Sequence, residues 1–87
     1  MVFYVYLIKT LNNHYKKSYV GYTNNLKNRI LMHNSNKGAK STKGYKWELV
    51  YKKSFKTKTA AMSYEYKLKK DRKKRASIIK SINDKKI

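Results

Sequence analysis

Two short apolar segments near the start of the chain predict two β-strands. Val2–Ile8 (VFYVYLI) has apolar or aromatic residues at positions that face both sides of a strand, and it is rich in β-branched residues and tyrosine. Ser18–Tyr22 (SYVGY) follows after a polar stretch that contains Asn12 and Asn13. Because asparagine tolerates the left-handed backbone of tight turns, we expect these two asparagines to form the centre of a β-hairpin.

A helix, a loop and a third strand are predicted next. Thr23 is a good N-cap, and Asn24–Asn34 has a helical period of apolar residues. The apolar side of this helix consists of Leu26, Ile30 and Leu31. Asn34–Gly44 (NSNKGAKSTKG) is polar and contains two of the three glycines, which predicts a loop. Lys46–Phe55 then predicts a strand whose alternating residues are Trp47, Leu49 and Tyr51.

The remainder of the chain predicts two more helices. Thr57 or Thr59 caps a helix that runs to about Lys70. Its stripe of mainly apolar residues consists of Ala61, Tyr64, Glu65 and Leu68. After the very basic segment Asp71–Arg75, the residues Ala76–Asn83 predict a short amphipathic helix.

This order of elements, ββαβαα, predicts the fold class. A hairpin, a helix and a returning strand make a small three-stranded, mainly antiparallel sheet flanked by about three helices, an α/β protein of the α+β type. We expect one domain over residues 1–83, followed by a short basic tail at residues 84–87, because a chain of 87 residues leaves no room for a second domain.

The charge of the chain points to a large acidic partner. The net charge is +19, with 23 lysines and arginines against four acidic residues, and only three of the basic residues are arginine. Lysine is a mobile point charge that suits contacts with phosphate, so nucleic acid is the first candidate and an anionic membrane surface the second. Cysteine is absent, which excludes a disulfide scaffold and cysteine-ligated metal sites. The longest apolar run is too short to span a bilayer, so we expect a cytoplasmic protein.

Few polar residues have the setting for chemistry. Arg29 and His33 are four residues apart on the predicted helix and therefore share a face, where each is either a functional group or an ordinary exposed residue. Glu65 lies on an apolar stripe, where it could hold Mg²⁺ together with substrate phosphate, or simply pair with Lys69 one turn later.

The predicted hairpin contributes three more candidates. A register centred on the two asparagines places Tyr6 opposite Tyr19, where the hydroxyls could act chemically or the rings could merely pack. Gly21 lies inside the second strand and therefore marks either a bulge or a place where another group approaches the backbone closely.

In this order, these segments resemble the GIY-YIG nuclease superfamily. The matching segments are YVYLI, SYVGYTNNLKNRILMHN, KGAKSTKG and a late glutamate before KLKK, which together cover nearly the whole chain. The nearest likeness is to the small single-domain bacterial branch, which is related to the UvrC N-terminal domain and the catalytic domain of Slx nucleases. Tyr4 stands where the family usually has glycine, and Ser77 stands in the region where UvrC-like members have an asparagine.

The resemblance implies phosphodiester hydrolysis with one divalent ion. It assigns the metal to Glu65, with Mg²⁺ or Mn²⁺ as the ion, and the stabilisation of the phosphate to Arg29. It leaves Tyr6, Tyr19 and His33 as rival bases, with a cationic pocket expected to favour the tyrosinate form. Lysines of the central loop and of the predicted helix near Glu65 would hold the nucleic-acid backbone: Lys37, Lys40, Lys43, Lys67, Lys69 and Lys70.

Three readings of the function follow. The first is a divalent-metal-dependent endonuclease acting on DNA, including structured or damaged DNA as in DNA repair, with RNA as an open alternative. The second is a non-catalytic basic nucleic-acid-binding module on the same fold. The third, association with a membrane surface through the C-terminal lysines and isoleucines, has less support. We expect a monomer or a weak dimer, a protein partner that supplies targeting, and no membrane partner.

Overall fold

The computed structural model describes residues 1–11, 17–38 and 40–85. Its strands are β1 (Phe3–Thr10), β2 (Ser18–Thr23) and β3 (Trp47–Phe55), and its helices are α1 (Leu26–Asn34), α2 (Lys58–Lys70) and α3 (Arg72–Lys85). A short 3-10 helix, η1 (Lys40–Thr42), lies in the predicted central loop. The order ββαβαα and the α+β fold class are confirmed.

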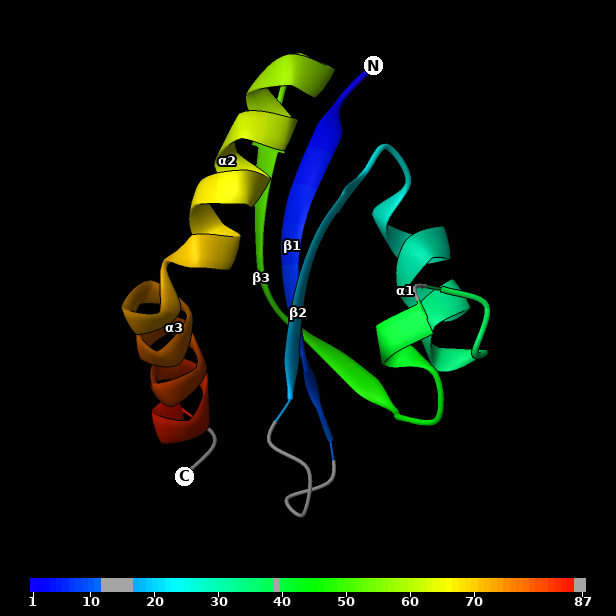
Figure 1. Ribbon diagram of the computed structural model, residues 1–87, viewed down its shortest axis with the longest axis vertical. Helices are drawn as coiled ribbons and strands as arrows, with labels where there is room; N and C mark the ends of the chain where they lie inside the picture. Colours follow the sequence, from blue (N-terminus) through cyan, green and yellow to red (C-terminus); the bar gives the residue numbers. More distant parts are fainter. Residues whose placement is uncertain (12–16, 39, 86–87) are drawn as a thin grey trace.

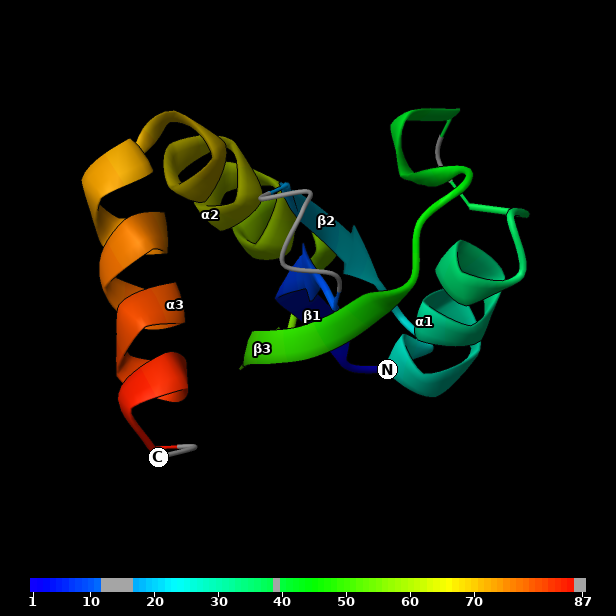
Figure 2. The same cartoon turned by 90° about the horizontal axis from the view of Figure 1, so that it is seen from below.

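The sheet is antiparallel and has the strand order β2-β1-β3 (Figure 1). The central strand β1 is covered on both faces, since α1 lies on one side of the sheet and α2 and α3 lie on the other (Figure 2). The first strand has a continuous apolar run because both of its faces are covered. The four residues at its centre, Val5, Tyr6, Leu7 and Ile8, are all fully buried.

The predicted register of the hairpin was wrong by two residues. Tyr6 pairs with Gly21, and Tyr19 pairs with Ile8. The pairs from Tyr4 with Thr23 to Lys9 with Ser18 establish this register, which the positions of the two asparagines in the sequence did not reveal. The turn itself, residues 12–16, lies outside the described residues. Because side chains alternate with a period of two, a two-residue shift leaves both tyrosines on the same face.

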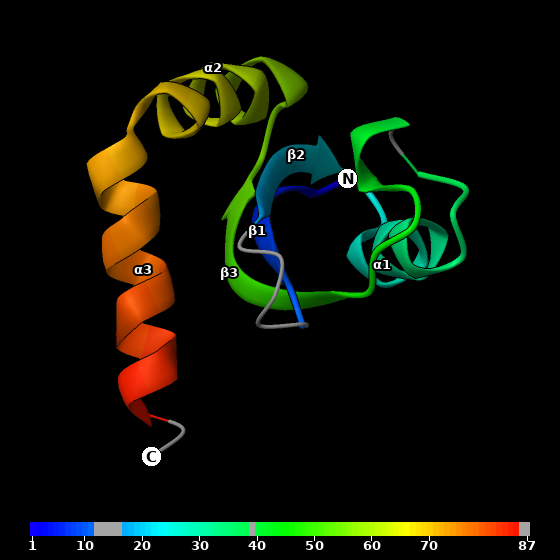
Figure 3. The ribbon, with the colours of Figure 1, turned by 60° about the horizontal axis from the view of Figure 1, so that its bottom comes forward.

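A β-bulge interrupts the alternation that was predicted for the third strand. Leu7 pairs with Tyr51 and Ile8 with Leu49, so Val50 is the extra residue on β3. Trp47 therefore packs against Tyr6 and Ile8 on the α1 side, whereas Tyr51 packs on the opposite side. Figure 3 shows β3 curving around toward α1 along this stretch.

Two apolar clusters result, one on each face of the sheet. On the α2 and α3 side, the buried residues are Val5, Leu7, Val20, Val50, Ala61 and Leu68. On the α1 side they are Tyr6, Ile8 and Trp47. The α1 side thus contains a tyrosine in its buried centre, and this tyrosine carries the only hydroxyl among these buried apolar residues.

At the starts of the helices, one predicted N-cap is confirmed, one predicted N-cap is wrong, and the predicted first residue of the third helix is wrong. Thr57 caps α2, since its hydroxyl accepts a hydrogen bond from the backbone N–H of Ala60. Helix α1 is capped by Asn25 rather than by Thr23, whose hydroxyl accepts from the backbone N–H of Asn25. The third helix was predicted to begin at Ala76 but begins at Arg72.

The early start of α3 has a local cause. The Asp71 carboxylate accepts a hydrogen bond from the backbone N–H of Lys74, which is the pattern of an N-cap, and the very basic segment is therefore helical. The same helix includes Asp84 and Lys85, which we had assigned to the tail, while residues 86–87 lie outside the described part. Among the described helices, none has the length and apolar content needed to cross a membrane.

Candidate functional site

The site is built around Tyr6 on the central strand. Its side chain is fully buried, and the ring passes directly over the backbone of Gly21 on β2. A Cβ atom placed on Gly21 would lie 2.5 Å from the Tyr6 Oη atom. Of the two explanations for this glycine, close approach is confirmed, and the bulge lies elsewhere, between β1 and β3.

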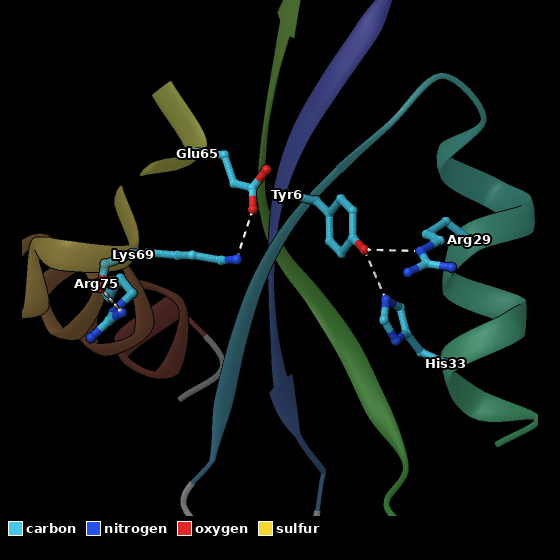
Figure 4. Close-up of polar contacts among 6 residues, drawn as sticks. All are labelled: Tyr6, Arg29, His33, Glu65, Lys69 and Arg75. Carbon is cyan, nitrogen blue, oxygen red and sulfur yellow. Dashed lines mark hydrogen bonds and ion pairs between the residues drawn. The ribbon is translucent and has the colours of Figure 1, made fainter. Parts of the chain in front are cut away.

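Helix α1 supplies two polar partners to Tyr6, as Figure 4 shows. The Tyr6 Oη atom lies 2.8 Å from Nε2 of His33, and Arg29 donates its Nε–H to the same oxygen over 3.4 Å. As predicted, Arg29 and His33 lie on the same face of α1. This face is directed toward the sheet, where both side chains contact Tyr6 of β1.

His33 is held on its other side by the central loop. Its Nδ1 atom lies 3.0 Å from the hydroxyl of Thr42, which is fully buried. The Trp47 indole N–H donates to the backbone carbonyl of Thr42 and so fixes η1 in place. A Cβ on Gly38 would approach Nδ1 of His33 to 2.5 Å, so this glycine also admits the ring.

Sequence reasoning missed Thr42 and Gly38 as parts of the site. Thr42 is nine residues from His33 in the chain, with an irregular segment between them, so no periodicity connects the two. The available signal was the segment KGAKST, Lys37–Thr42, which is part of the resemblance to the GIY-YIG family but was assigned a role only through its lysines.

Arg29 fixes the direction of one of these hydrogen bonds. A guanidinium can only donate, so the Tyr6 oxygen accepts from Arg29. The direction of the Tyr6–His33 and His33–Thr42 bonds depends on which ring nitrogen of His33 carries the proton. With the proton on Nδ1, Tyr6 donates its O–H to Nε2 and Nδ1–H donates to Thr42, which makes a chain of donors from Arg29 through Tyr6 and His33 to Thr42.

Burial favours the neutral forms of Tyr6 and His33. It raises the pKa of Tyr6 to about 12, and the hydrogen bond from Arg29 offsets only part of that rise. Burial, and then the positive charge of Arg29, lowers the pKa of His33. At Tyr6, desolvation therefore outweighs the positive charge of Arg29 alone, whereas the predicted tyrosinate depended on Arg29 together with a metal ion.

Tyr19 lies beside this cluster on the edge strand β2. Its ring centroid is 5.1 Å from that of His33 and 6.4 Å from that of Tyr6. Unlike these two buried residues, Tyr19 is half-buried. It therefore forms the part of the aromatic cluster that reaches solvent.

Glu65 comes from the opposite side, on α2. In Figure 4, its side chain reaches from α2 toward the strands, whereas Tyr6 points away from them toward α1. The carboxylate pairs with Lys69 at 2.8 Å and is 15% exposed. Its charge contributes to the raised pKa of Tyr6, and both Glu65 and Tyr19 help to raise the pKa of Lys69. These groups thus interact electrostatically without a direct contact between Glu65 and Tyr6.

The acidic residues allow only a sparse metal site. Among the described residues, no group of three or more histidine, aspartate or glutamate side chains could enclose an ion. Glu48 pairs with Lys9 at 3.4 Å on β1 and β3. A single carboxylate such as that of Glu65 is enough for a cation such as Mg²⁺, which needs only one or two carboxylates when phosphate and water complete its shell. Lys69 is 49% exposed and so has room to move off the carboxylate.

The predicted phosphate-binding lysines form two separate groups. One group, Lys37, Lys40 and Lys43, is exposed around η1 on the α1 side. The other group, Lys67, Lys69 and Lys70, is exposed in the last turns of α2 on the other side of the sheet (Figure 1). The structure therefore does not bring all six lysines to one place.

A three-stranded antiparallel sheet with a Tyr–His–Arg cluster under its first helix defines a small α+β domain with a polar site buried beside the sheet. The GIY-YIG catalytic domain profile matches residues 2–85, so the chain belongs to the GIY-YIG family, a nuclease superfamily. The resemblance seen in the sequence is confirmed.

Relatives from several bacteria are similar to this chain. The UPF0213 protein OB0043 of Oceanobacillus iheyensis is 43% identical over 67 residues, covering 76% of this chain and 74% of that protein. The UPF0213 protein YazA of Bacillus subtilis is 44% identical over 68 residues, covering 77% and 66%. The solution NMR structure of the UPF0213 protein BH0048 from Bacillus halodurans is 34% identical, with a TM-score of 0.50 and coverage of 92% and 84%. These names state no reaction, so they establish kinship and fold.

Proposed function

We propose that this protein is a divalent-metal-dependent endonuclease that hydrolyses phosphodiester bonds in DNA, with structured or damaged DNA as the preferred substrate. Membership of the GIY-YIG family supports a nuclease. The observation that carries the proposal is that Arg29 and His33 both form hydrogen bonds with the buried Tyr6 hydroxyl, while Glu65 of α2 is close enough to influence the pKa of Tyr6. Structural packing alone does not require three titratable side chains to meet in one place.

Arg29 is suited to bind the scissile phosphate. It uses Nε for Tyr6, and a guanidinium has five N–H donors, so further donors remain for phosphate oxygens. Its contact with Tyr6 is long, at 3.4 Å, and is therefore cheap to exchange for a contact with phosphate. In this role Arg29 would stabilise the negative charge that develops on phosphorus-bound oxygens.

Tyr6 and His33 together can act as a proton relay. Water adds to phosphorus and the bond to the leaving oxygen breaks, while one proton of the water passes to Tyr6 Oη and the Tyr6 proton passes to His33 Nε2. Because the two transfers are coupled, a free tyrosinate is not required, and its pKa of about 12 is no obstacle. The Nδ1–H bond to Thr42 holds the ring in the tautomer that can receive this proton.

Tyr19 is the alternative acceptor of the water proton. It is half-buried where Tyr6 is fully buried, so water reaches it more readily. Tyr6→Phe and Tyr19→Phe separate the two assignments, because each removes one hydroxyl and keeps the ring. The relay proposed here requires the larger loss of cleavage from Tyr6→Phe.

Glu65 would hold Mg²⁺ or Mn²⁺ after Lys69 leaves its carboxylate. The bound ion would supply Lewis-acid polarisation of the phosphate and stabilisation of the leaving oxygen. The lysines around η1 and at the end of α2 would contact the phosphate backbone without reading sequence.

The decisive experiment compares Glu65→Gln with Glu48→Gln. Both substitutions remove one ion-paired carboxylate and keep its shape, but Glu48 pairs with Lys9 instead. Labelled duplex, single-stranded, flap and four-way-junction DNA would be incubated with Mg²⁺, Mn²⁺ or EDTA. We expect divalent-dependent cutting that falls at least about 100-fold in Glu65→Gln and is unchanged in Glu48→Gln. Equal cutting by both variants would contradict the metal role of Glu65.

A non-catalytic nucleic-acid-binding module is the second candidate. Two observations favour it: Tyr6 and His33 are fully buried, and Glu65 is already engaged by Lys69. This alternative predicts salt-sensitive DNA binding with no divalent-dependent cutting of any substrate in the same assay.

A further inference from the structure

A second concave site lies on the other flank of α1. It is a groove of about 660 Å³ between the start of α1 and the strands β1 and β3. Its lining is mainly apolar, with Leu26, Ile30 and Leu31 from α1 and Leu49 from β3. Leu31 is 56% exposed and Leu49 is 38% exposed, so two leucines present their side chains to solvent at one place.

Helical geometry sets the exposed part of this groove apart from the polar partners of Tyr6. Residues of an α-helix are about 100° apart, so Arg29 and His33 project to one flank, while Lys27 and Leu31 project to the opposite flank. Arg29 and His33 contact Tyr6, and neither of them lines the groove. The floor of the groove adjoins the cluster around Tyr6, because Leu26 and Ile30 line the groove and also pack against that cluster.

The charges around the groove select the occupant. Lys27 and Lys52 line it, and no acidic residue does. Leucines beside lysines are complementary to a segment that carries large apolar residues flanked by carboxylates. A second copy of this chain does not meet that need, because it has only four acidic residues and a net charge of +19.

Nucleic acid fits the groove less well than a protein segment does. Phosphates would be attracted to Lys27 and Lys52, but a duplex backbone offers nothing to cover the exposed leucines. We propose that this groove, on the flank of α1 opposite Arg29 and His33, docks an acidic segment of a partner protein through one or more large apolar side chains. Such docking does not depend on the proposed cleavage, since it is measured as binding.

The test uses a random 16-residue peptide library displayed on phage and selected on the full 87-residue protein. Every enriched peptide would be synthesised and its affinity measured for wild type, for Leu31→Ser and Leu49→Ser, and for Met62→Ser. All three substitutions keep the net charge, and Met62 is an exposed apolar residue of α2, 47% exposed, that serves as the matched control. General attraction of acidic peptides to a basic protein is therefore the same in every variant.

We expect enriched peptides with leucine, isoleucine or phenylalanine flanked by aspartate or glutamate. Their affinity should fall at least about tenfold in Leu31→Ser and Leu49→Ser and stay unchanged in Met62→Ser. Thermal melts would confirm that the variants fold. We expect them to fold, because the substituted leucines are exposed and such substitutions usually change stability little. Peptide titration followed by NMR should shift signals of Lys27, Leu31 and Leu49 more than those of Arg29 and His33.

Three results would overturn the proposal. The first is a library that yields no peptide with a preference for wild type over Leu31→Ser. The second is peptides whose signals map to Arg29 and His33. The third is four-way-junction or duplex DNA that competes with the peptide and loses affinity in Leu49→Ser, since the groove would then belong to the nucleic-acid surface.

Discussion

His33 is the residue on which the hydrogen bonds of the site converge. Its two nitrogens contact Tyr6 and Thr42, and the proposed relay requires the proton of the neutral ring on Nδ1, so that Nε2 can accept from Tyr6. We expect long-range nitrogen-15 NMR at pH 7.5 to show His33 as the Nδ1–H tautomer. The other histidine, His14, provides the internal reference signal. An Nε2–H tautomer at His33 would contradict the donor chain and, with it, the proposed relay.

The lowered pKa of His33 also makes stability depend on pH. The folded protein keeps the ring neutral, whereas the unfolded chain binds a proton near the ordinary pKa of 6.5. The unfolded state therefore binds more protons below pH 6.5, and stability falls as the pH drops through this value by up to about 1.4 kcal/mol per pH unit. Denaturant unfolding at pH 7.5 and 5.5 should show this loss in wild type and in His14→Gln. It should be absent in His33→Gln, and a loss of equal size there would contradict the assignment.

Gly21 supports the same cluster from the neighbouring strand. A methyl group in Gly21→Ala would lie 2.5 Å from Tyr6 Oη, so either the ring or the strand must move. We expect a loss of about 1–3 kcal/mol in unfolding free energy from overpacking, together with a changed Tyr6–His33 contact seen in the His33 NMR signals. Gly44→Asn is the control, because Gly44 has a φ of +85°, open space around it, and a backbone that asparagine tolerates. An unperturbed His33 signal in Gly21→Ala would contradict this account of the glycine.

At the scale of the residue, the sequence identified the groups that local spacing connects. Arg29 and His33 were placed on one face by the helical period. Tyr6 was identified because it lies in an apolar strand. Thr42 and Gly38 could not be found, because their contact with His33 depends on the path of an irregular loop. The resting pKa of Tyr6 also required the structure, since burial outweighs the neighbouring positive charge that the sequence revealed.

At the scale of the element, the same contrast holds. Patterns of apolar residues predicted the three strands and the three α-helices of the described residues, because each of them buries apolar side chains in a pattern typical of its type. The short 3-10 helix η1 was not predicted and lies in the segment expected to be a loop. The hairpin register and the β3 bulge were not predictable, since both depend on pairing with β1 rather than on local composition. The bulge has a functional effect because it turns Trp47 to the α1 side, where the indole holds Thr42 against His33.

The cap of α2 is an element-scale prediction with a built-in control. The sequence left Thr57 and Thr59 open, and the structure shows the Thr57 hydroxyl accepting from the backbone N–H of Ala60. Thr57→Ala should lower the unfolding free energy by about 1 kcal/mol, whereas Thr59→Ala, in the first turn, should change it much less. Since α2 also carries Glu65, the Thr57→Ala variant should loosen the start of the helix that carries the proposed metal ligand. Chemical denaturation of both variants gives the measurement, and equal losses would contradict the cap.

At the scale of the whole molecule, the two faces of the sheet carry different candidate functional groups. The α1 face buries the Tyr6 cluster, the α2 face carries Glu65 at its edge, and the two groups of lysines lie on the two sides of the sheet. A nucleic acid that contacted both groups would have to pass across an edge strand of the sheet, either β2, where Tyr19 reaches solvent, or β3. The path of the nucleic acid is therefore testable through charge.

Salt dependence of DNA binding measures that path. Each phosphate contact that is lost should reduce the slope of log K against log salt by about 0.9 for duplex DNA. Replacing Lys37, Lys40 and Lys43 with glutamine should therefore lower the slope by up to about 2.7, and replacing Lys67, Lys69 and Lys70 should do the same. The charge-matched control replaces Lys56, Lys58 and Lys80, which are also exposed, and should alter the slope much less. Slopes that fall equally in all three variants would mean that the net charge of +19 attracts DNA without a defined path. A loss confined to one group would place the DNA on one side of the sheet only.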